Sequence, residues 1–134
     1  PHLRQSEVGH VLALSPPVRQ LSQRWLAPHL EYTLSKYGMT MCMLAHASKG
    51  VCANTLWPKH VIATAATRML EEQTGHPVFT KGRAPDYVAE AVHRLLCTDA
   101  TGQMLFDQDL VPPPSKCEAP LDMFVEEEEQ QTVA

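Results

Sequence analysis

The chain lacks the patterns that mark metal sites, disulfide frameworks and membrane spans. Its four cysteines form no Cys-x-x-Cys pair, and its seven histidines form no His-x-x-x-His pair. This spacing predicts free, mostly buried thiols in a reducing compartment and no bound metal. No run approaches the ~18 apolar residues that a membrane-spanning helix needs. Residues 1–7 are not followed by the apolar segment of a signal peptide.

Charge and glycine content exclude two further kinds of site. A formal net charge of −4 gives no basic surface of the kind that binds nucleic acid. The six glycines stand far apart, so no glycine-rich loop that could cradle a phosphate is present. With 134 residues, 44% of them hydrophobic, the chain suits one modest domain or part of a larger one.

What the chain does have is an alternation of short apolar strands and longer helical segments. Residues 8–14, 51–56 and 104–106 are predicted strands, and they show little polar alternation, as in strands covered on both faces. Helices are predicted over residues 28–48, from Pro58 or Lys59 to residue 73, and over residues 85–97. This order predicts an α/β fold in which the three strands are adjacent and parallel.

One residue pair in the first long helix suggests chemistry. Tyr32 and Lys36 are four residues apart, so both side chains lie on one face of a helix. A lysine ammonium favours the ionised form of a neighbouring phenol, and such a phenol can act as a general acid or base on an alcohol or carbonyl. Tyr37 has Met41 four residues on instead of a lysine, so it is expected to pack. Spacing alone favours an ordinary amphipathic helix with a half-buried tyrosine and a solvated lysine.

The motifs around this pair occur in a specific order. A strand ends at a Ser-Pro-Pro turn, the helix carries YTLSKYGMTMCM, the next strand ends in Leu-Trp-Pro-Lys, and the last follows Thr-Gly-Gln. This order resembles the C-terminal half of the short-chain dehydrogenase/reductase family, most closely its hydroxysteroid dehydrogenase-like branch. The resemblance extends to about residue 109, and more loosely over residues 121–124. It implies the C-terminal half of a Rossmann-type doubly wound parallel sheet over residues 1–110, without the glycine-rich N-terminal half. Residues 111–134 are expected to form a Pro-rich, acidic tail.

The resemblance also implies residue roles. Tyr32 would be the acid/base that exchanges a proton with the substrate oxygen, while Lys36 would bind the nicotinamide ribose and lower the Tyr32 pKa. The serine of the family maps best onto Ser15, although its 17-residue separation from Tyr32 exceeds the usual gap. A cap or turn role for Ser15 before two prolines is an equal alternative. Ser22 is a weaker candidate for the same role.

The implied cofactor is NADP or NAD, with its pyrophosphate site missing from this chain. Pro58 opens the turn that in relatives passes beneath the nicotinamide carboxamide, and Lys59 stands where relatives usually have glycine. Ile62 and Thr64 would contact the carboxamide and the neighbouring phosphate. Core packing for Ile62 and a helix-surface hydroxyl for Thr64 are equal alternatives. Asn54 is expected to hydrogen bond to backbone.

Together these features predict an NAD(P)-dependent oxidoreductase that interconverts a small alcohol and a carbonyl, with the isolated fragment inactive. The resemblance further implies a homo-oligomer formed through the Tyr32-containing helix, and a mitochondrial or peroxisomal location, with a cytoplasmic one also possible. Two rivals stay open. One is a catalytically incomplete fragment that only packs or dimerises. The other is a helical adaptor whose residues 97–106 form an antiparallel, wing-like hairpin. Neither the substrate nor the choice between NAD and NADP is encoded in a recognisable motif.

Overall fold

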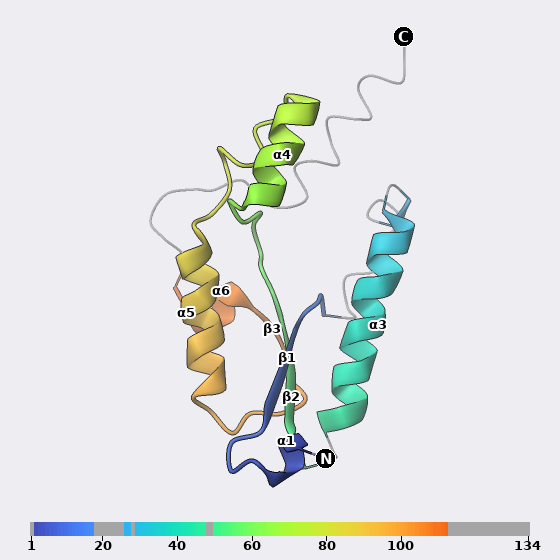
Figure 1. Ribbon diagram of the computed structural model, residues 1–134, viewed down its shortest axis with the longest axis vertical. Coiled ribbons are helices and arrows are strands. Elements are labelled where there is room, and N and C mark those ends of the chain that lie inside the picture. Colours follow the sequence, from blue (N-terminus) through green and yellow to red (C-terminus); the bar gives the residue numbers. More distant parts are fainter. Residues whose placement is uncertain (1, 18–25, 28, 48–49, 113–134) are drawn as a thin grey trace.

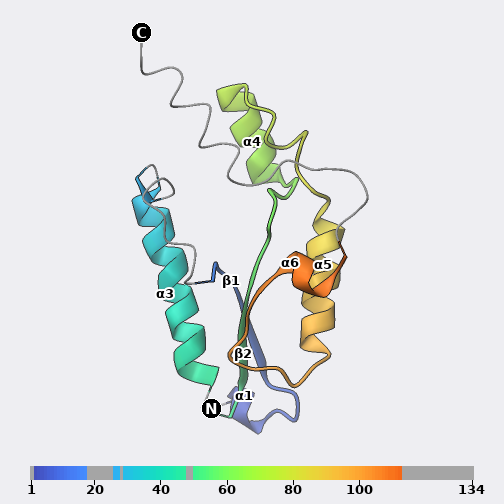
Figure 2. The same cartoon turned by 180° about the vertical axis from the view of Figure 1, so that it is seen from behind.

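The sheet and its two covering helices form three layers. The computed structural model describes residues 2–17, 26–27, 29–47 and 50–112. A short parallel sheet forms the middle layer, with α3 (Leu30–Ala47) on one side and α5 (Pro85–Leu96) on the other (Figures 1 and 2). The chain enters this sheet from α1 (His2–Gln5) and leaves it through α6 (Asp107–Leu110).

The three predicted strands are adjacent and parallel, which confirms the predicted fold class. β1 (His10–Leu14), β2 (Cys52–Trp57) and β3 (Met104–Phe106) lie in the order β1-β2-β3. An antiparallel hairpin within residues 97–106 is therefore wrong, and so is the winged-helix alternative built on it. The central strand β2 is the most buried, because its neighbours and the helix layers cover it on both sides and both faces.

The apolar core lies between the sheet and α5. Leu56 of β2 packs with Val88 and Ala91 of α5, and all three side chains are buried. Burying such side chains is the main favourable term in folding and is worth roughly 1.5–3 kcal/mol for each large aliphatic group. α5 begins at Pro85, whose fixed φ and missing N–H suit the first position of a helix.

The helix after β2 begins later than predicted. The sequence pattern placed its start at Pro58 or Lys59, but α4 spans Ala65–Thr74. Residues 58–64 instead run as an extended segment, in which Ile62 forms a parallel bridge with Arg83. Thr64 then caps α4 through a reciprocal capping box with Thr67, which fixes the first helical turn at this point.

No residue of α4 is buried. The helix ends at Thr74, one residue beyond its predicted end, because the next residue, Gly75, adopts the left-handed conformation with φ 74°. α4 lies beyond the carboxyl ends of the strands, away from the core layers (Figure 1). It is therefore positioned by its connecting loops and not by burial.

α3 matches the predicted long helix within the described residues, while Pro28 and Ser48 at its predicted ends lie outside them. Its buried positions are Thr33, Tyr37 and Thr40. Four apolar side chains of this helix are exposed: Leu30, Leu34, Met39 and Met41. Among the described residues, no helix combines the length and apolar character that crossing a bilayer requires, and no group of three potential ligands is arranged to hold a metal ion.

Candidate active site

The carboxyl ends of β1 and β2 meet at one edge of the sheet. Leu14 and Leu56 are paired in register, and the Ser15 amide continues the ladder by donating to the Leu56 carbonyl oxygen at 3.1 Å. Pro58 follows β2 directly, so it opens its turn at the same edge. Ligands of open α/β sheets bind in a crevice outside the carboxyl ends of the strands, which is this edge.

α3 presents a polar stripe to this edge. Tyr32, Lys36 and Thr40 are four residues apart and therefore share one helix face. The Lys36 ammonium donates to the carbonyl oxygen of Leu14 at 3.1 Å. It also lies 5.6 Å from the centroid of the Tyr32 ring, within cation–π distance. Lys36 thus ties the tyrosine-bearing helix to the last residue of β1.

Tyr32 is half-exposed, with 51% of its surface accessible. Partial burial raises the pKa of its phenol, because the charged form is poorly solvated there. This direction is opposite to the one expected for a lysine-assisted phenol. The cause of the rise is burial, while the Lys36 ammonium donates to the Leu14 carbonyl oxygen and lies over the face of the ring. Burial thus makes the Tyr32 phenol hold its proton more tightly than an ordinary tyrosine does.

Ser15 is fully buried beneath α3. The Thr40 hydroxyl lies 2.9 Å from Ser15 Oγ and 2.8 Å from the Pro16 carbonyl oxygen, and it is the donor in both contacts. One hydroxyl proton is shared between these two acceptors, and this bifurcated hydrogen bond fixes the Ser15–Pro16 turn to α3. This geometry favours the turn-forming interpretation of Ser15. Ser22, the weaker candidate, lies outside the described residues.

The segment after β2 carries the other expected binding residues. Pro58 is buried, while Ile62 is partly buried and packs against the core of Leu56 and Val88. Thr64 is exposed, and its hydroxyl accepts from the Thr67 amide at 3.4 Å as the cap of α4. Packing for Ile62 and a surface hydroxyl for Thr64 are therefore observed. Neither observation tests contact with a cofactor.

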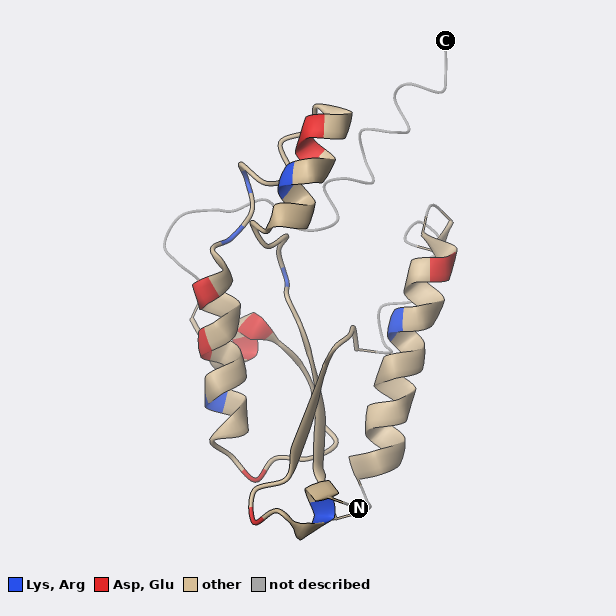
Figure 3. Cartoon of the chain, in the orientation of Figure 1, with Lys and Arg blue, Asp and Glu red and all other residues tan. Residues whose placement is uncertain are grey.

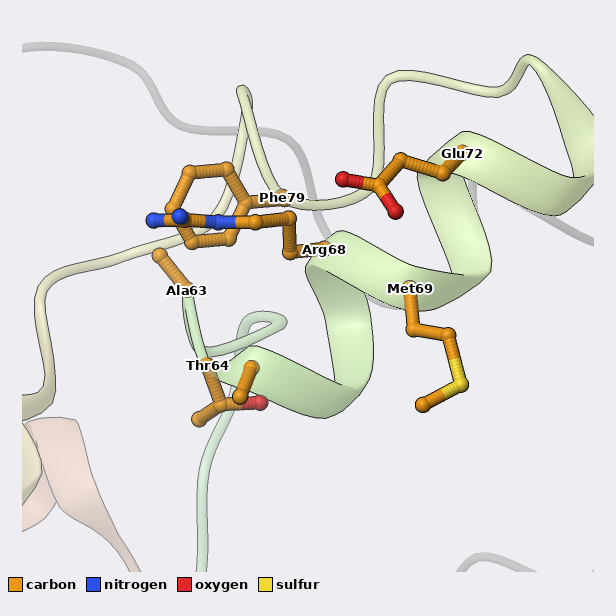
Figure 4. Close-up of a pocket in the computed structure, with 7 residues that line it drawn as sticks. Ala63, Thr64, Arg68, Met69, Glu72 and Phe79 are labelled. Atoms are coloured by element: carbon orange, nitrogen blue, oxygen red, sulfur yellow. The ribbon is translucent and has the colours of Figure 1, made fainter.

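An open pocket of about 450 Å³ lies beside Thr64, between α4 and the loop that follows it. Figure 4 shows the Arg68 guanidinium lying over the Phe79 ring at its rim, 4.4 Å from the ring centroid. Glu72 approaches the same space from the next turn of α4. The pocket lining is otherwise largely apolar, and its residues are Ala63, Thr64, Ala65, Arg68, Met69, Glu72 and Phe79.

Comparison with known proteins identifies the fold. Hydroxysteroid dehydrogenase-like protein 2 of Xenopus laevis is 41% identical over 116 residues, which are 83% of this chain. The human protein of the same name is 36% identical over the same length. A short-chain dehydrogenase structure from Mycobacterium thermoresistibile superposes with a TM-score of 0.67, at 35% identity over 83% of this chain and 40% of that one. The chain is a relative of the short-chain dehydrogenases.

A second dehydrogenase structure, from Xanthomonas campestris, agrees with this assignment. Its TM-score is 0.71 at 37% identity, over 83% of this chain and 42% of that one. The strands and helices described above are therefore part of a Rossmann-type fold. No family model matches the chain. The chain spans 27% of the length of the Xenopus laevis and human relatives.

Two other predictions for this dehydrogenase relative are confirmed. Asn54 is structural, since its amide donates to the Ala100 carbonyl oxygen at 2.7 Å and its Oδ1 accepts from the Gln103 amide at 3.0 Å. Tyr37 is buried in the core-facing side of α3. Tyr32 and Tyr37, only five residues apart, thus differ in both exposure and neighbours.

The sequence analysis missed three polar residues of this edge: Thr40, Arg83 and Asp107. Thr40 was detectable, because it continues the four-residue spacing of Tyr32 and Lys36. Arg83 and Asp107 form a buried ion pair at 3.5 Å, and no local pattern predicts a contact across 24 residues of sequence.

Proposed function

We propose that this chain carries the acid–base part of an NAD(P)(H)-dependent oxidoreductase that interconverts a small alcohol and a carbonyl. The observation that carries the proposal is the Tyr32–Lys36 pair on α3, fastened to the end of β1 by the Lys36 hydrogen bond to Leu14. The kinship with short-chain dehydrogenases supports the oxidoreductase class. The nicotinamide cofactor and the proton-transfer role of Tyr32 are the proposed refinements.

The residues at the sheet edge fit the nicotinamide end of such a cofactor. Lys36 has three N–H donors, and one of them serves the Leu14 carbonyl, so others are available for ribose hydroxyls. The turn at Pro58 and the side chain of Ile62 would face the carboxamide, and the exposed Thr64 hydroxyl would face a phosphate. When bound, the cofactor supplies hydride transfer.

The chain's own task is to move a proton and to orient the groups around it. In the reducing direction the Tyr32 hydroxyl donates its proton to the substrate oxygen, and in the oxidising direction the phenolate accepts one. The raised pKa keeps this proton in place at neutral pH, which suits the reducing direction. Lys36 limits the cost of forming the phenolate, because a cation nearby stabilises it. Ser15 Oγ accepts from Thr40 and so keeps its own proton to donate, but its side chain is fully buried. For Ser15 to polarise the substrate oxygen, the Ser15–Pro16 turn must expose this hydroxyl.

We further propose that α3 joins two copies of the protein. Glu31 and Lys36 are the charged residues of this helix, and Figure 3 shows the rest of its length without charge. Leu34 and Met41 leave 62% and 59% of their surfaces exposed. Contiguous apolar surface of this kind is typical of a contact between chains. The same observation supports the rival function, a catalytically incomplete module that only packs or dimerises.

A matched pair of tyrosine variants tests the proposal in the full-length protein. Tyr32→Phe keeps the ring but removes the proton, so turnover should fall about 10²–10⁴-fold while cofactor affinity stays unchanged. Tyr37→Phe, five residues away, should keep wild-type turnover. Steady-state kinetics with NADH and NADPH on a panel of small alcohols and carbonyls, with cofactor titration by fluorescence, measures both. Full activity of Tyr32→Phe would remove Tyr32 from the mechanism.

A Lys36 variant provides a second, independent test of the proposed function. Lys36→Ala should weaken cofactor binding and turnover together, because Lys36 is proposed to act on both the ribose and the phenol. A protein that is folded and dimeric but shows no turnover with any of these substrates and cofactors would instead favour the packing module.

A further inference from the structure

A buried ion pair lies beside the segment that follows β2. Asp107 is completely buried and Arg83 is 3% exposed, and their charged groups are 3.5 Å apart. Neither residue is part of the Tyr32–Lys36 stripe. A buried charge is costly unless it is paired, so this pair constrains the backbone around it to one arrangement.

Asp107 uses its second oxygen to hold backbone. Its Oδ1 accepts from the amide of Lys59 at 2.9 Å and from the amide of Gln108 at 2.9 Å. Hydrogen bonds to an ionised acceptor are stronger than those between neutral groups. The carboxylate therefore joins the turn after β2 to the first turn of α6.

The backbone of Arg83 binds the same segment two and four residues further on. Its amide donates to the Val61 carbonyl oxygen at 2.8 Å, and its carbonyl oxygen accepts from the Ala63 amide at 2.9 Å. Its guanidinium lies over the Tyr87 ring, 4.1 Å from the centroid, and the Tyr87 hydroxyl in turn donates to the Val111 carbonyl oxygen. These contacts, with Tyr87 of α5 and through it with Val111 after α6, fix the position of the Arg83 side chain.

We infer that Arg83 and Asp107 are positioning residues for residues 58–64, the segment that follows β2 at the carboxyl edge of the sheet. The Asp107 carboxylate binds the Lys59 amide, and the Arg83 backbone pairs with Val61 and Ala63. These three residues lie between Pro58, Ile62 and Thr64 along the segment. The link to catalysis rests on the proposed function, in which those last three residues face the nicotinamide end of the cofactor. Displacing the segment then weakens cofactor binding and leaves proton transfer at Tyr32 intact.

Hydrogen exchange and kinetics on full-length Asp107→Asn test this inference. Asparagine keeps the shape and one acceptor but removes the charge that faces Arg83. Amide exchange in residues 59–63 should speed up about tenfold, the usual effect of weakening a charged hydrogen bond, while exchange in β2 stays unchanged. The KM for the nicotinamide cofactor should rise about tenfold by the same reasoning, with kcat at saturating cofactor and substrate KM within about twofold. Glu90→Gln, which breaks the exposed pair with Arg94 and leaves the Arg94 hydrogen bond to the Leu110 carbonyl oxygen in place, is the control.

A double variant separates positioning from stability. Arg83→Met combined with Asp107→Asn removes both buried charges, so it should fold even where a single variant does not. The thermal midpoint of the double variant should return from that of Asp107→Asn toward the wild-type value. Fast amide exchange in residues 59–63 and the high KM for the cofactor should persist. Recovery of the cofactor KM together with the midpoint would overturn the inference. So would unchanged exchange in residues 59–63, or equal acceleration throughout the sheet. Absence of any turnover in the wild-type protein refutes the proposed function instead, and the exchange result still decides the positioning role.

Discussion

Burial raises the pKa of the Tyr32 phenol, so the phenolate forms less readily than in an ordinary tyrosine. Alcohol oxidation needs the phenolate, which becomes more abundant as pH rises toward that pKa. We therefore expect kcat/KM for oxidation by the full-length protein to rise about tenfold per pH unit from pH ~6 to ~9, below the ordinary phenol pKa of about 10. The profile for carbonyl reduction should be flat over the same range, because the proton donor is already present.

The check on this prediction is the pH dependence in both directions with one alcohol–carbonyl pair. A plateau in oxidation already reached near pH 7 would contradict it. Such a plateau would mean that Lys36 stabilises the phenolate more than burial destabilises it.

Thr40 offers a second test at this scale, because its hydroxyl serves two buried acceptors, Ser15 Oγ and the Pro16 carbonyl oxygen. Thr40→Val keeps the shape and removes the donor, so the free energy of unfolding should fall by about 1–3 kcal/mol. Thr40→Ser retains the hydroxyl and should lose clearly less. Urea denaturation of the three proteins measures the difference. Equal losses in both variants would show that the methyl group, and not the hydrogen bond, matters.

Sequence reasoning was strong for residues whose neighbours are local. Tyr32 and Lys36 share a helix face by spacing alone, and Tyr37 could be distinguished by the missing lysine. Ser15 was harder, because its burial depends on Thr40, which lies 25 residues away. A hydroxyl before two prolines looks the same in sequence whether it faces a substrate or the underside of a helix.

α4 shows how an element can be held without a core. One of its connections to the following loop is the Glu71 carboxylate, which accepts from the Thr80 amide at 2.8 Å and from the Thr80 hydroxyl at 2.5 Å. These hydrogen bonds lower the pKa of Glu71, with the Thr80 hydroxyl as the larger cause. The contact is surface-exposed, so its contribution to stability is modest.

The lowered pKa fixes the direction of a pH effect. The Glu71 contribution is fully present above the unfolded glutamate pKa of about 4.3 and is lost as pH falls through the lower folded value. Glu71→Gln should therefore lower the thermal midpoint at pH 6 and make little difference near pH 2.5. Glu72→Gln, one residue on, is the control and should match wild type at both values. A constant offset for Glu71→Gln at every pH would contradict the prediction.

The elements themselves were predictable where hydrophobic pattern and tertiary structure agree. All three strands and α5 were found within two residues at either end, because their apolar runs also supply most of their buried and partly buried residues. The start of α4 was not, since the pairing of Ile62 with Arg83 extends the chain through residues that have helical spacing. A contact between segments 21 residues apart overrides local propensity.

For the whole molecule, the scattered glycines have a measurable consequence. A glycine-rich turn supplies the backbone N–H groups that bind a pyrophosphate at a helix N-terminus. We expect the 134-residue chain on its own to show no cofactor binding by calorimetry with NAD or NADP. The Xenopus laevis relative, titrated in parallel, provides the comparison. Tight binding to the isolated chain would require a phosphate site that the fold described here does not contain.

The exposed apolar face of α3 predicts the assembly state. Leu34→Lys in the full-length protein should convert a dimer to a monomer, because a charge is buried without a partner when the two helices meet. Met69→Lys on α4, where the native side chain is 56% exposed, should leave assembly unchanged. Sedimentation velocity distinguishes the two outcomes. A dimer that survives Leu34→Lys would place the contact elsewhere.

The order of the sheet has a consequence for how the polypeptide behaves in the test tube. Among the described residues β1 pairs with β2 alone, so one rim of the sheet offers a row of unmatched backbone donors and acceptors along His10–Leu14. Such a rim is a template on which another extended peptide can add. Its sequence, HVLAL, contains no lysine, proline or acidic residue that would discourage this addition. Yield and shelf life of a recombinant preparation will thus depend on what covers this rim, since an uncovered one grows into insoluble aggregates as concentration rises.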